Sequence, residues 1–345
     1  MTRMKSASRI GASVDNPPIL YDQGMAHDPE FEVQRAVSAA GRRHQPGDLV
    51  LIGVSGGADS LALAAFAAKE AESGVRFGAV VVDHMLQAGS ADVAATASAI
   101  CREIGLDPVI ETHVHVMQGS GGLEQAARNA RRSSLLAAAE EHDASAIWLA
   151  HTADDQAETV LLGLLRGSGP RSMAGMRMFD GIWERPLLRL HRDVVRAALA
   201  RLAISAHEDP HNLDRRFTRV KVRLDVLPML ERELGGQITE NLIRSADLFR
   251  DDNDALDAMA DAWHSEHPQL DIEALRHLPR AVRTRVVRLA ILEYGTPANG
   301  LTKEHIDAVE HLAMESRATG PVRLPGMLQA AKDRLSGVIR FEPTE

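Results

Sequence analysis

Short apolar runs alternate with helical patterns between residues 49 and 165. Residues 49–52 (LVLI) are apolar at every position, which is typical of a parallel strand buried on both faces, and residues 59–72 follow with helical spacing. The same alternation predicts strands at residues 77–82, 108–116 and 146–150, and helices at residues 90–104, 123–142 and 153–165. Elements in this order form right-handed βαβ units, so we predict an α/β fold with a doubly wound parallel sheet.

The pattern changes on both sides of this segment. Residues 1–28 contain Pro, Ser, Gly and Asn without periodicity, so we expect a disordered leader. Residues 229–314 are mainly helical in pattern, and the short apolar run near the C-terminus predicts no further domain. We therefore predict a larger α/β domain at residues 29–228 and a smaller all-helical domain at residues 229–345.

Composition narrows the class of protein. The chain has 345 residues, of which 45% are apolar, and no run approaches ~20 consecutive apolar residues, so we expect a cytoplasmic protein without a membrane span. The single cysteine, Cys101, excludes an internal disulfide and a thiol-only metal site within one chain. The formal net charge is −9, but residues 166–223 hold 13 Lys or Arg against 6 Asp or Glu. This basic segment is a candidate surface for a polyanion.

The stretch GVSGGADS at residues 53–60 joins the first predicted strand to the first helix. One interpretation is a strand-to-helix turn in which glycine supplies positive φ and serine caps the helix. The other is a phosphate cradle, because Gly56 and Gly57 would leave backbone amides open at a helix N-terminus. Asp59 would repel phosphate unless a divalent cation lay between them, and Mg²⁺ bridging the carboxylate and phosphate oxygens resolves that conflict.

Two other motifs share part of this pattern. A Walker A loop needs a Lys-Ser or Lys-Thr pair after its glycines, and this loop has none. GVSGG also fits the G-x-S-x-G nucleophile elbow of serine hydrolases, but that elbow follows several earlier strands, whereas this stretch ends the first predicted strand. We therefore favour the phosphate cradle.

Further motifs sharpen the comparison. They are VDHMLQ at 82–87, GLEQAARNARR at 122–132, HTADDQAETVLLGLLRGSGP at 151–170, RPLL at 185–188, HEDPHNLDRRFTRVKVR at 207–223 and LPML at 227–230. SGGADS resembles the pyrophosphate-binding loop of the N-type ATP pyrophosphatases, the PP-loop family. With the other motifs in this order, the chain resembles the tRNA(Ile)-lysidine synthetase family. The resemblance implies a Rossmann-like sheet of the adenine nucleotide alpha hydrolase type.

Two departures and two exclusions qualify this resemblance. At the position of Arg219-Val220-Lys221 the family often has Arg-Asn followed by a basic residue, so Val220 stands where an asparagine is usual. The second departure is that a further C-terminal domain found in some members is not expected here. Relatives that thiolate RNA bases generally use paired cysteines, which one cysteine cannot supply. Guanylate synthetases would carry a glutaminase domain, for which the chain has no room.

The resemblance implies that the C2 oxygen of cytidine 34 in a CAU anticodon attacks the α-phosphate of ATP, and that the amine of free L-lysine then displaces AMP. It assigns ATP and Mg²⁺ as cofactors and tRNA(Ile) as the partner, and it leaves a homodimer open. The expected ATP or pyrophosphate ligands are Ser55, Gly56, Gly57, Ala58, Asp59, Ser60, Val82, Asp83, His84, Arg128 and Gly167. A surface Glu124–Arg128 pair and a plain loop at Gly167 are the structural alternatives.

The block after the fourth predicted strand concentrates acids. Lysine needs a proton acceptor because its ammonium, with a pKa near ~10.4, is not a nucleophile. Four residues crowd the start of one predicted helix and are the catalytic candidates together with Asp59: His151, Asp154, Asp155 and Glu158. Asp59 and Asp155 are the expected Mg²⁺ ligands. The alternative interpretation of the block is a capping box formed by Thr152 and Asp155.

The basic segment predicts contacts to tRNA phosphates. The candidates are Arg131, Arg189, Arg192, Arg216, Arg219 and Arg223, and a solvated charged face is the structural alternative for each of them. Two other functions stay open at this stage: a PP-loop enzyme that adenylates RNA for another acceptor, and a non-catalytic RNA-binding relative.

Overall fold

The computed structural model describes residues 28–83, 85, 89–114, 122–167, 169–297, 300–315 and 320–344, with the backbone alone for 122–125. The expected disordered leader at residues 1–28 lies outside the described residues except for Asp28. His84, one of the expected nucleotide ligands, and the side chain of Glu124 also lie outside them.

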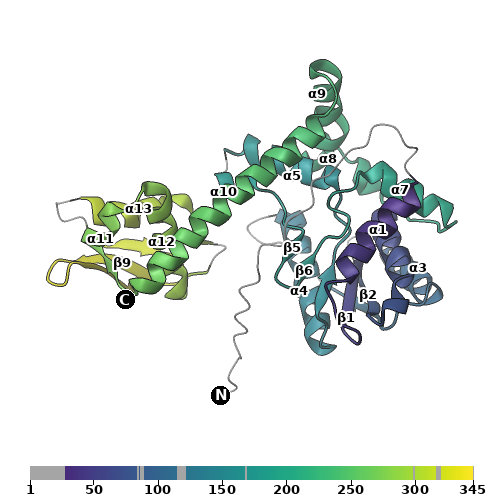
Figure 1. The fold of residues 1–345 in the computed structure, drawn as a ribbon, viewed down its shortest axis with the longest axis horizontal. Helices are drawn as coiled ribbons and strands as arrows, with labels where there is room; N and C mark the ends of the chain where they lie inside the picture. The colour runs from purple at the N-terminus through teal and green to yellow at the C-terminus, as the bar shows by residue number, and fades with distance from the viewer. Residues whose placement is uncertain are drawn as a thin grey trace.

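The larger part of the molecule is built on a six-stranded sheet with the order β3-β2-β1-β4-β6-β5 (Figure 1). Its strands are β1 (Leu49–Val54), β2 (Arg76–Asp83), β3 (Val109–His113), β4 (Ala146–Trp148), β5 (Phe179–Asp180) and β6 (Trp183–Glu184). Neighbouring strands are parallel except for β5 with β6. Since β2 and β3 lie on one side of β1 and β4 on the other, the strand order reverses between β1 and β4. The predicted doubly wound fold is confirmed.

Helices cover both faces of this sheet. The helices of this part are α1 (Pro29–Gly41), α2 (Ala58–Ala68), α3 (Ser90–Glu103), α4 (Gly122–Glu141), α5 (Ala153–Leu165), α6 (Pro170–Met173) and α7 (Arg192–Arg201), with short turns η1 (Ala71–Ser73) and η2 (Pro210–Leu213). Of these, α5 and α6 pack against α10 (Ile238–Glu266). Side chains of α1, α2, α3 and α7 pack on one face, and those of α4 pack on the other. Val50 and Ile52 of β1 face the first group while Leu49 and Leu51 face α4, which explains why every position of this strand is apolar.

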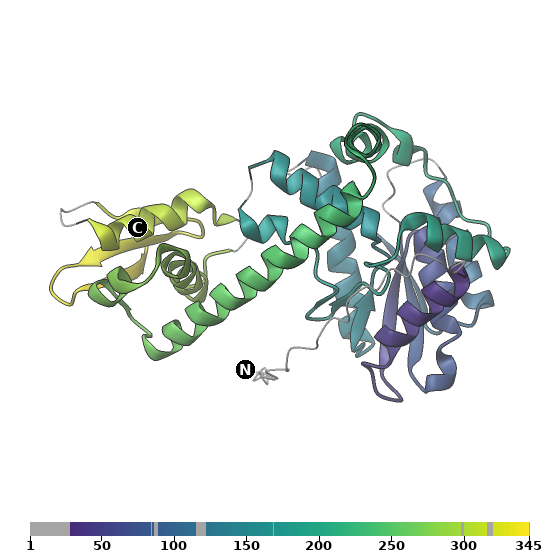
Figure 2. The same cartoon turned by 45° about the horizontal axis from the view of Figure 1, so that its top comes forward.

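A helical segment leads out of the sheet domain. It contains α8 (Thr218–Lys221), the π-helical turn η3 (Val222–Val226), α9 (Leu227–Leu234) and α10 (Ile238–Glu266). The long helix α10 packs against α5 and α6 at one end and α12 at the other, so it joins the two parts of the molecule (Figures 1 and 2). The two parts meet at Asp257 of α10, whose Oδ1 contacts Arg171 of α6 at 2.5 Å and Arg285 of α12 at 2.7 Å.

The C-terminal part corrects the all-helical expectation for residues 229–345. It contains β7 (Leu270–Asp271), α11 (Ile272–His277), α12 (Arg280–Glu293), α13 (Lys303–Met314), β8 (Val322–Leu324), β9 (Leu328–Asp333) and β10 (Val338–Pro343). The four strands form an antiparallel sheet in the order β7-β10-β9-β8. They are short, and β9 (LQAAKD) contains two alanines, which are depleted in strands, so the sequence gives little strand signal. The domain boundary at residue 228 stays a prediction.

Within the described part of the chain, no helix combines the length and the apolar character needed to cross a membrane.

The fold generates a prediction at Gly78 of β2. A Cβ atom at this position would lie 2.7 Å from the carbonyl oxygen of Pro108 and 2.9 Å from a methyl carbon of Leu51. Because the first contact is with backbone, we expect Gly78→Ala to lower the free energy of unfolding by about 2 kcal/mol. Urea denaturation measures this change. Gly236→Ala is the control, since no atom lies within 4 Å of its added Cβ, and equal stability of the two variants would contradict the prediction.

Candidate active site

The glycine junction forms an open loop between β1 and α2. Gly56 adopts a φ of 78°, and the N-cap residue Gly57 supplies no side-chain hydrogen bond to the first turn of α2. The hydroxyl of Ser60 accepts a hydrogen bond from the amide of Ser55 at 3.1 Å and donates one to the carbonyl of Gly57 at 2.9 Å. The serine therefore braces the loop, while the helix N-terminus that begins at Ala58 stays without a capping side chain. This is the geometry of an anion cradle.

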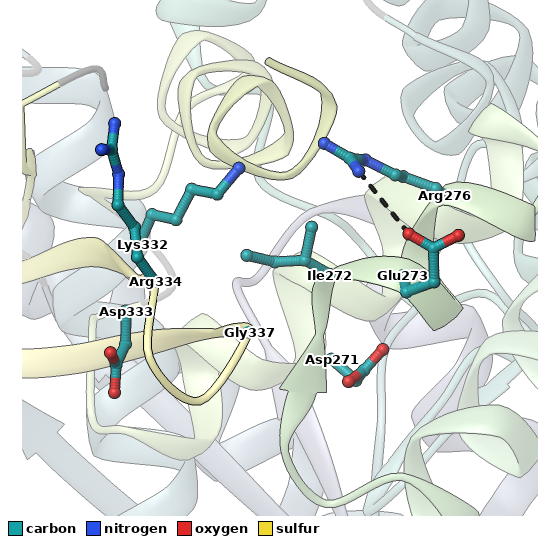
Figure 3. A pocket seen from close by; sticks show the side chains of 8 residues that line it. All are labelled: Asp271, Ile272, Glu273, Arg276, Lys332, Asp333, Arg334 and Gly337. Carbon is teal, nitrogen blue, oxygen red and sulfur yellow. Dashed lines mark ion pairs between the residues drawn. The ribbon is translucent and has the colours of Figure 1, made fainter. Parts of the chain in front are cut away.

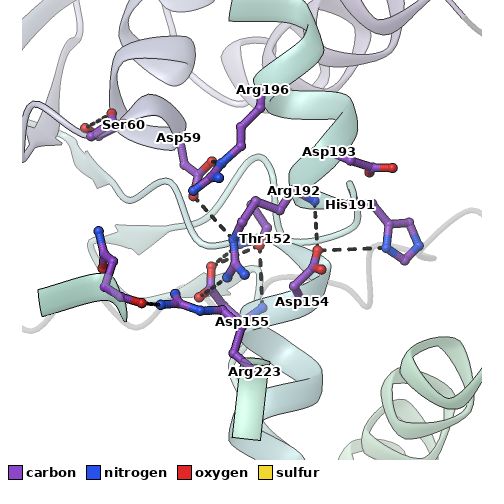
Figure 4. Close-up of polar contacts among 12 residues, drawn as sticks. Asp59, Ser60, Thr152, Asp154, Asp155, His191, Arg192, Asp193, Arg196 and Arg223 are labelled. Carbon is purple, nitrogen blue, oxygen red and sulfur yellow. Dashed lines mark hydrogen bonds and ion pairs between the residues drawn. The ribbon is translucent and has the colours of Figure 1, made fainter. Parts of the chain in front are cut away.

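Asp59 lies in the first turn of α2 and faces two arginines of α7 (Figure 4). The Nε atoms of Arg192 and Arg196 each lie 3.6 Å from one of its carboxylate oxygens. Within the described structure, Oδ1 of Asp59 is buried and has no hydrogen-bond partner. Burial raises the pKa of this carboxyl above its usual range, although both arginines oppose the shift. A buried acceptor without a donor fits a cation ligand.

The first turn of α5 contains the capping box that the sequence offered as an alternative. The amide and hydroxyl of Thr152 donate to Oδ2 of Asp155 at 2.9 and 3.0 Å, and the amide of Asp155 lies 3.5 Å from the threonine hydroxyl. The other oxygen of Asp155 contacts Arg192 at 2.9 Å and Arg219 at 3.2 Å. One carboxylate oxygen of Asp155 therefore caps the helix N-terminus, and the other pairs with the two arginines.

Glu158 lies one turn further along α5, and its side chain is 0% exposed. Its Oε2 accepts a hydrogen bond from Nε of Arg219 at 2.6 Å, and its Oε1 lies 3.3 Å from Nη2 of Arg192. A buried carboxylate is stable only when it is paired, and here two guanidinium groups provide the pairing. Arg192 and Arg219, which the sequence analysis assigned to tRNA, thus contact the acidic residues, and their contacts with tRNA stay a prediction.

Asp154 connects α5 to α7. Its Oδ2 accepts a hydrogen bond at 2.7 Å from the backbone amide of Arg192, the first residue of α7, and lies 3.8 Å from Nδ1 of His191. The other ring nitrogen of His191 lies 3.3 Å from Glu240 of α10. The carboxylate of Asp154 therefore satisfies a helix N-terminus and aligns Arg192 with the acidic cluster.

Buried cationic groups lie near this cluster. Burial lowers the pKa of His151 well below its usual range, so its imidazole is neutral at neutral pH. Burial and neighbouring Arg128 lower the pKa of Arg131, which has no ion pair within the described residues. Nε of Arg185 and Nδ1 of His151 are buried without hydrogen-bond partners there. Arginines without an acidic partner at hydrogen-bond distance, beside a neutral histidine that can donate a hydrogen bond, suit an anionic ligand.

The remaining predicted site residues lie around this centre or away from it. Val82 and Asp83 end β2, where Oδ1 of Asp83 accepts a hydrogen bond from the amide of Met85 at 2.8 Å. Gly167 follows α5 with a φ of 63° and open space beside it. Arg189 pairs with Asp247 of α10, and the exposed Arg216 pairs with Asp214. Nη2 of Arg223 donates to the carbonyl of Asn212. The ligand assignments of all these residues stay predictions.

The donor set for a metal is limited. Among the described residues, no group of three or more His, Cys, Asp or Glu side chains could hold a metal ion. Mg²⁺ keeps several waters and takes substrate phosphates as ligands, so one protein carboxylate suffices beside a nucleotide. Asp59, whose buried Oδ1 accepts no hydrogen bond within the described structure, fits this role. Both oxygens of Asp155 already have partners in the capping box and with the arginines.

Sequence reasoning missed several parts of this arrangement. The pairing of Arg192 and Arg219 with acids of α5, and of Arg196 with Asp59, joins residues that are far apart in the chain. The spacing of arginines at positions 185, 189, 192 and 196 was visible but equally compatible with an exposed stripe. The one signal that could have found the pairing is the coincidence of this stripe with an acid-rich helix start in the same domain.

A separate cavity of about 420 Å³ lies in the C-terminal part (Figure 3). It lies between β7, α11 and the turn that joins β9 to β10, and it is distinct from the carboxyl edge of the large sheet. Its lining residues are Asp271, Ile272, Glu273, Arg276, Lys332, Asp333, Arg334 and Gly337. Equal numbers of acids and bases line it, so it has no strong preference for one sign of charge.

Comparison with known proteins defines the class. Residues 29–230 match the PP-loop domain, and residues 270–336 match the TilS substrate binding domain. The solved structure of the U34-tRNA thiolase NcsA from Methanococcus maripaludis superposes with a TM-score of 0.54 at 20% identity, covering 64% of this chain and 79% of NcsA. This likeness supports the fold alone. The match over residues 29–230 makes the sheet part a PP-loop domain. In doubly wound sheets ligands bind outside the carboxyl ends of the strands, which is where the glycine loop and the start of α5 lie.

Relatives of known function specify the family. The tRNA(Ile)-lysidine synthase of Thermobifida fusca (strain YX) is 48% identical over 85% of this chain and 92% of its own length. The synthase of Leifsonia xyli subsp. xyli (strain CTCB07) is 46% identical over 86% of this chain and 91% of its own length. That of Streptomyces coelicolor (strain ATCC BAA-471 / A3(2) / M145) is 46% identical over 85% of each chain. This chain belongs to the tRNA(Ile)-lysidine synthase family.

The buried pairing of Glu158 generates a stability prediction. Glu158→Gln removes the negative charge between Arg192 and Arg219 and leaves two guanidinium groups with less compensation. We expect the free energy of unfolding to fall by about 3 kcal/mol, measured by chemical denaturation. The control is Glu208→Gln, which changes an exposed glutamate and should alter stability by less than about 0.5 kcal/mol. A Glu158 variant as stable as this control would show that the pairing contributes nothing to folding.

Proposed function

We propose that this member of the tRNA(Ile)-lysidine synthase family ligates lysine to C2 of cytidine 34 in the CAU anticodon of tRNA(Ile), through an adenylated tRNA intermediate. The observation that carries the proposal is the bridge that Arg192 forms between Asp59, next to the glycine loop, and Asp155 at the acid-rich start of α5. This contact sets a phosphate-binding element beside groups that can hold an ammonium ion. A ligase that first adenylates its RNA substrate with ATP and then binds an amine as the nucleophile needs both elements side by side.

In the first step, the cradle binds the β- and γ-phosphates of ATP through the amides at the start of α2. The C2 oxygen of cytidine 34 attacks the α-phosphate, and pyrophosphate leaves with the electrons of the broken bond. Mg²⁺, when bound, would neutralise charge on the phosphates, and Asp59 would hold it through Oδ1, which accepts no hydrogen bond within the described structure. The half-buried Arg131 and the buried Arg185, which have no acidic partner at hydrogen-bond distance within the described residues, would stabilise charge on the transferred group.

In the second step, the ε-amine of free L-lysine attacks C2 of the adenylated cytidine, and AMP leaves. Asp155 and Glu158 attract the ammonium to the start of α5, where it competes with the guanidinium groups of Arg192 and Arg219 for the same oxygens. The amine loses one proton before attack and one after it. Among Asp154, Asp155 and Glu158, the carboxylate of Asp154 is the most exposed, so it is the group that would pass these protons to solvent.

The C-terminal part holds the body of the tRNA in this proposal. The match to the TilS substrate binding domain supports this role, and the tRNA-facing candidates of the sheet domain are the exposed Arg216 and the half-buried Arg223. Phosphate contacts should dominate the affinity because the whole chain has only 12 aromatic side chains for base stacking. Assembly as a homodimer and residence in the cytoplasm remain further predictions of the proposal.

Incorporation of lysine tests the function directly. The full-length protein is incubated with ATP, Mg²⁺, radiolabelled lysine and an isoleucine tRNA bearing CAU, and label in the RNA is measured. We expect label in this tRNA and none when the first anticodon base is changed to uridine. AMP release with tRNA but without label in the RNA would favour an adenylating enzyme with another acceptor. Binding of tRNA without AMP release would favour a non-catalytic relative.

Asp59 provides a test of the metal and phosphate assignment. Asp59→Ala removes the carboxylate that faces the cradle but leaves the basic surfaces intact. We expect AMP formation to fall at least about 100-fold, because charge on the leaving pyrophosphate is no longer neutralised, while tRNA affinity changes less than about twofold. Gel-shift and AMP-release assays measure the two quantities. Retention of AMP formation would remove Asp59 from the mechanism.

A further inference from the structure

The two arginines that face Asp59 differ in how firmly they are held. Arg192 is 13% exposed, and it also contacts Asp155 and Glu158 of α5. Arg196, one turn further along α7, is 57% exposed, and Asp59 is its one ion-pair partner within the described residues. The contact joins Nε of Arg196 to Oδ1 of Asp59 at 3.6 Å, which is too long for a hydrogen bond. Arg192 is therefore fixed and Arg196 is free to turn.

The guanidinium of Arg196 and a divalent metal ion cannot both occupy the position beside Oδ1 of Asp59. In this structure the guanidinium of Arg196 stands next to the same oxygen, Oδ1, that is buried without a hydrogen-bond donor. A divalent cation bound by that oxygen would repel the guanidinium and take over its partner. Arg196 would then need another anion. The nearest available charge would be the polyphosphate of the nucleotide, which the proposed function places at the start of α2 beside Asp59.

We propose that Arg196 is a phosphate-binding residue of the cradle, which rests on Asp59 before the nucleotide arrives and turns onto the β- or γ-phosphate when Mg²⁺ takes the carboxylate. Figure 4 shows the arrangement that permits this exchange: Arg196 descends from α7 toward Asp59, with Ser60 of the same loop nearby. The long, exposed arginine side chain can move without disturbing the packing of α7, whose buried face is formed by Val195, Ala198 and Leu199.

The inference rests on the proposed function, and a binding measurement separates the two. Isothermal titration calorimetry with ATP and MgCl₂, and with pyrophosphate and MgCl₂, is carried out without tRNA on the full-length protein. Arg196→Gln should weaken both ligands about tenfold, because one charge-assisted contact to phosphate is lost. Arg196→Lys, which keeps the charge, should recover most of the affinity.

Arg201→Gln is the matched control. Arg201 lies on the same helix, is 49% exposed and pairs with Asp28, away from the cradle, so its replacement should leave both affinities unchanged. Equal affinities of the Arg196→Gln and Arg201→Gln proteins would overturn the inference. Tighter binding by Arg196→Gln would also overturn it, because Arg196 would then act only as a competitor of the metal. Failure of the unaltered protein to bind either ligand would instead count against the proposed function.

Discussion

The ion pairing of Glu158 with Arg192 and Arg219 is the interaction on which the site depends. The carboxylate is fully buried on α5, while the two guanidinium groups come from α7 and α8. Burial of an ionised carboxylate is costly unless both of its oxygens have donors, so these three helices must meet in one arrangement. Arg192 extends the same pairing to Asp155 and Asp59. The glycine loop that precedes α2 and the acidic start of α5 are thereby held at a fixed separation.

This arrangement also changes how the basic segment is understood. Its arginines suggested a surface for RNA, yet several of them face inward. Arg192 and Arg219 neutralise acids of α5, Arg189 pairs with Asp247, and Arg185 is buried. The local positive charge of the segment therefore largely balances carboxylates from elsewhere in the chain. Arg216 is one arginine of the segment that stays highly exposed, with 84% of its side chain accessible.

The elements of the sheet domain could be predicted because local patterns determine them. An apolar run such as LVLI, buried on both faces, and the Thr152–Asp155 capping box are visible within a few residues of sequence. The ion pairs could not be predicted in the same way, since Arg192 and Glu158 are separated by 34 positions and Arg219 and Glu158 by 61. The small C-terminal sheet was missed because its strands are short and β9 is alanine-rich. Its pairing is set by tertiary contacts around Leu275, Val286 and Leu312.

The length of helix α10 sets the distance between the two parts of the molecule. Its 29 residues correspond to about 43 Å at 1.5 Å per residue, and both parts of the protein are attached to it. Oδ1 of Asp257 pairs with Arg171 from one part and with Arg285 from the other, so both parts are tied to the same point of the helix. In the proposed function the C-terminal part holds the RNA, and α10 then sets the distance between that part and the start of α2. Selection among RNAs can then depend on their dimensions as well as on their bases.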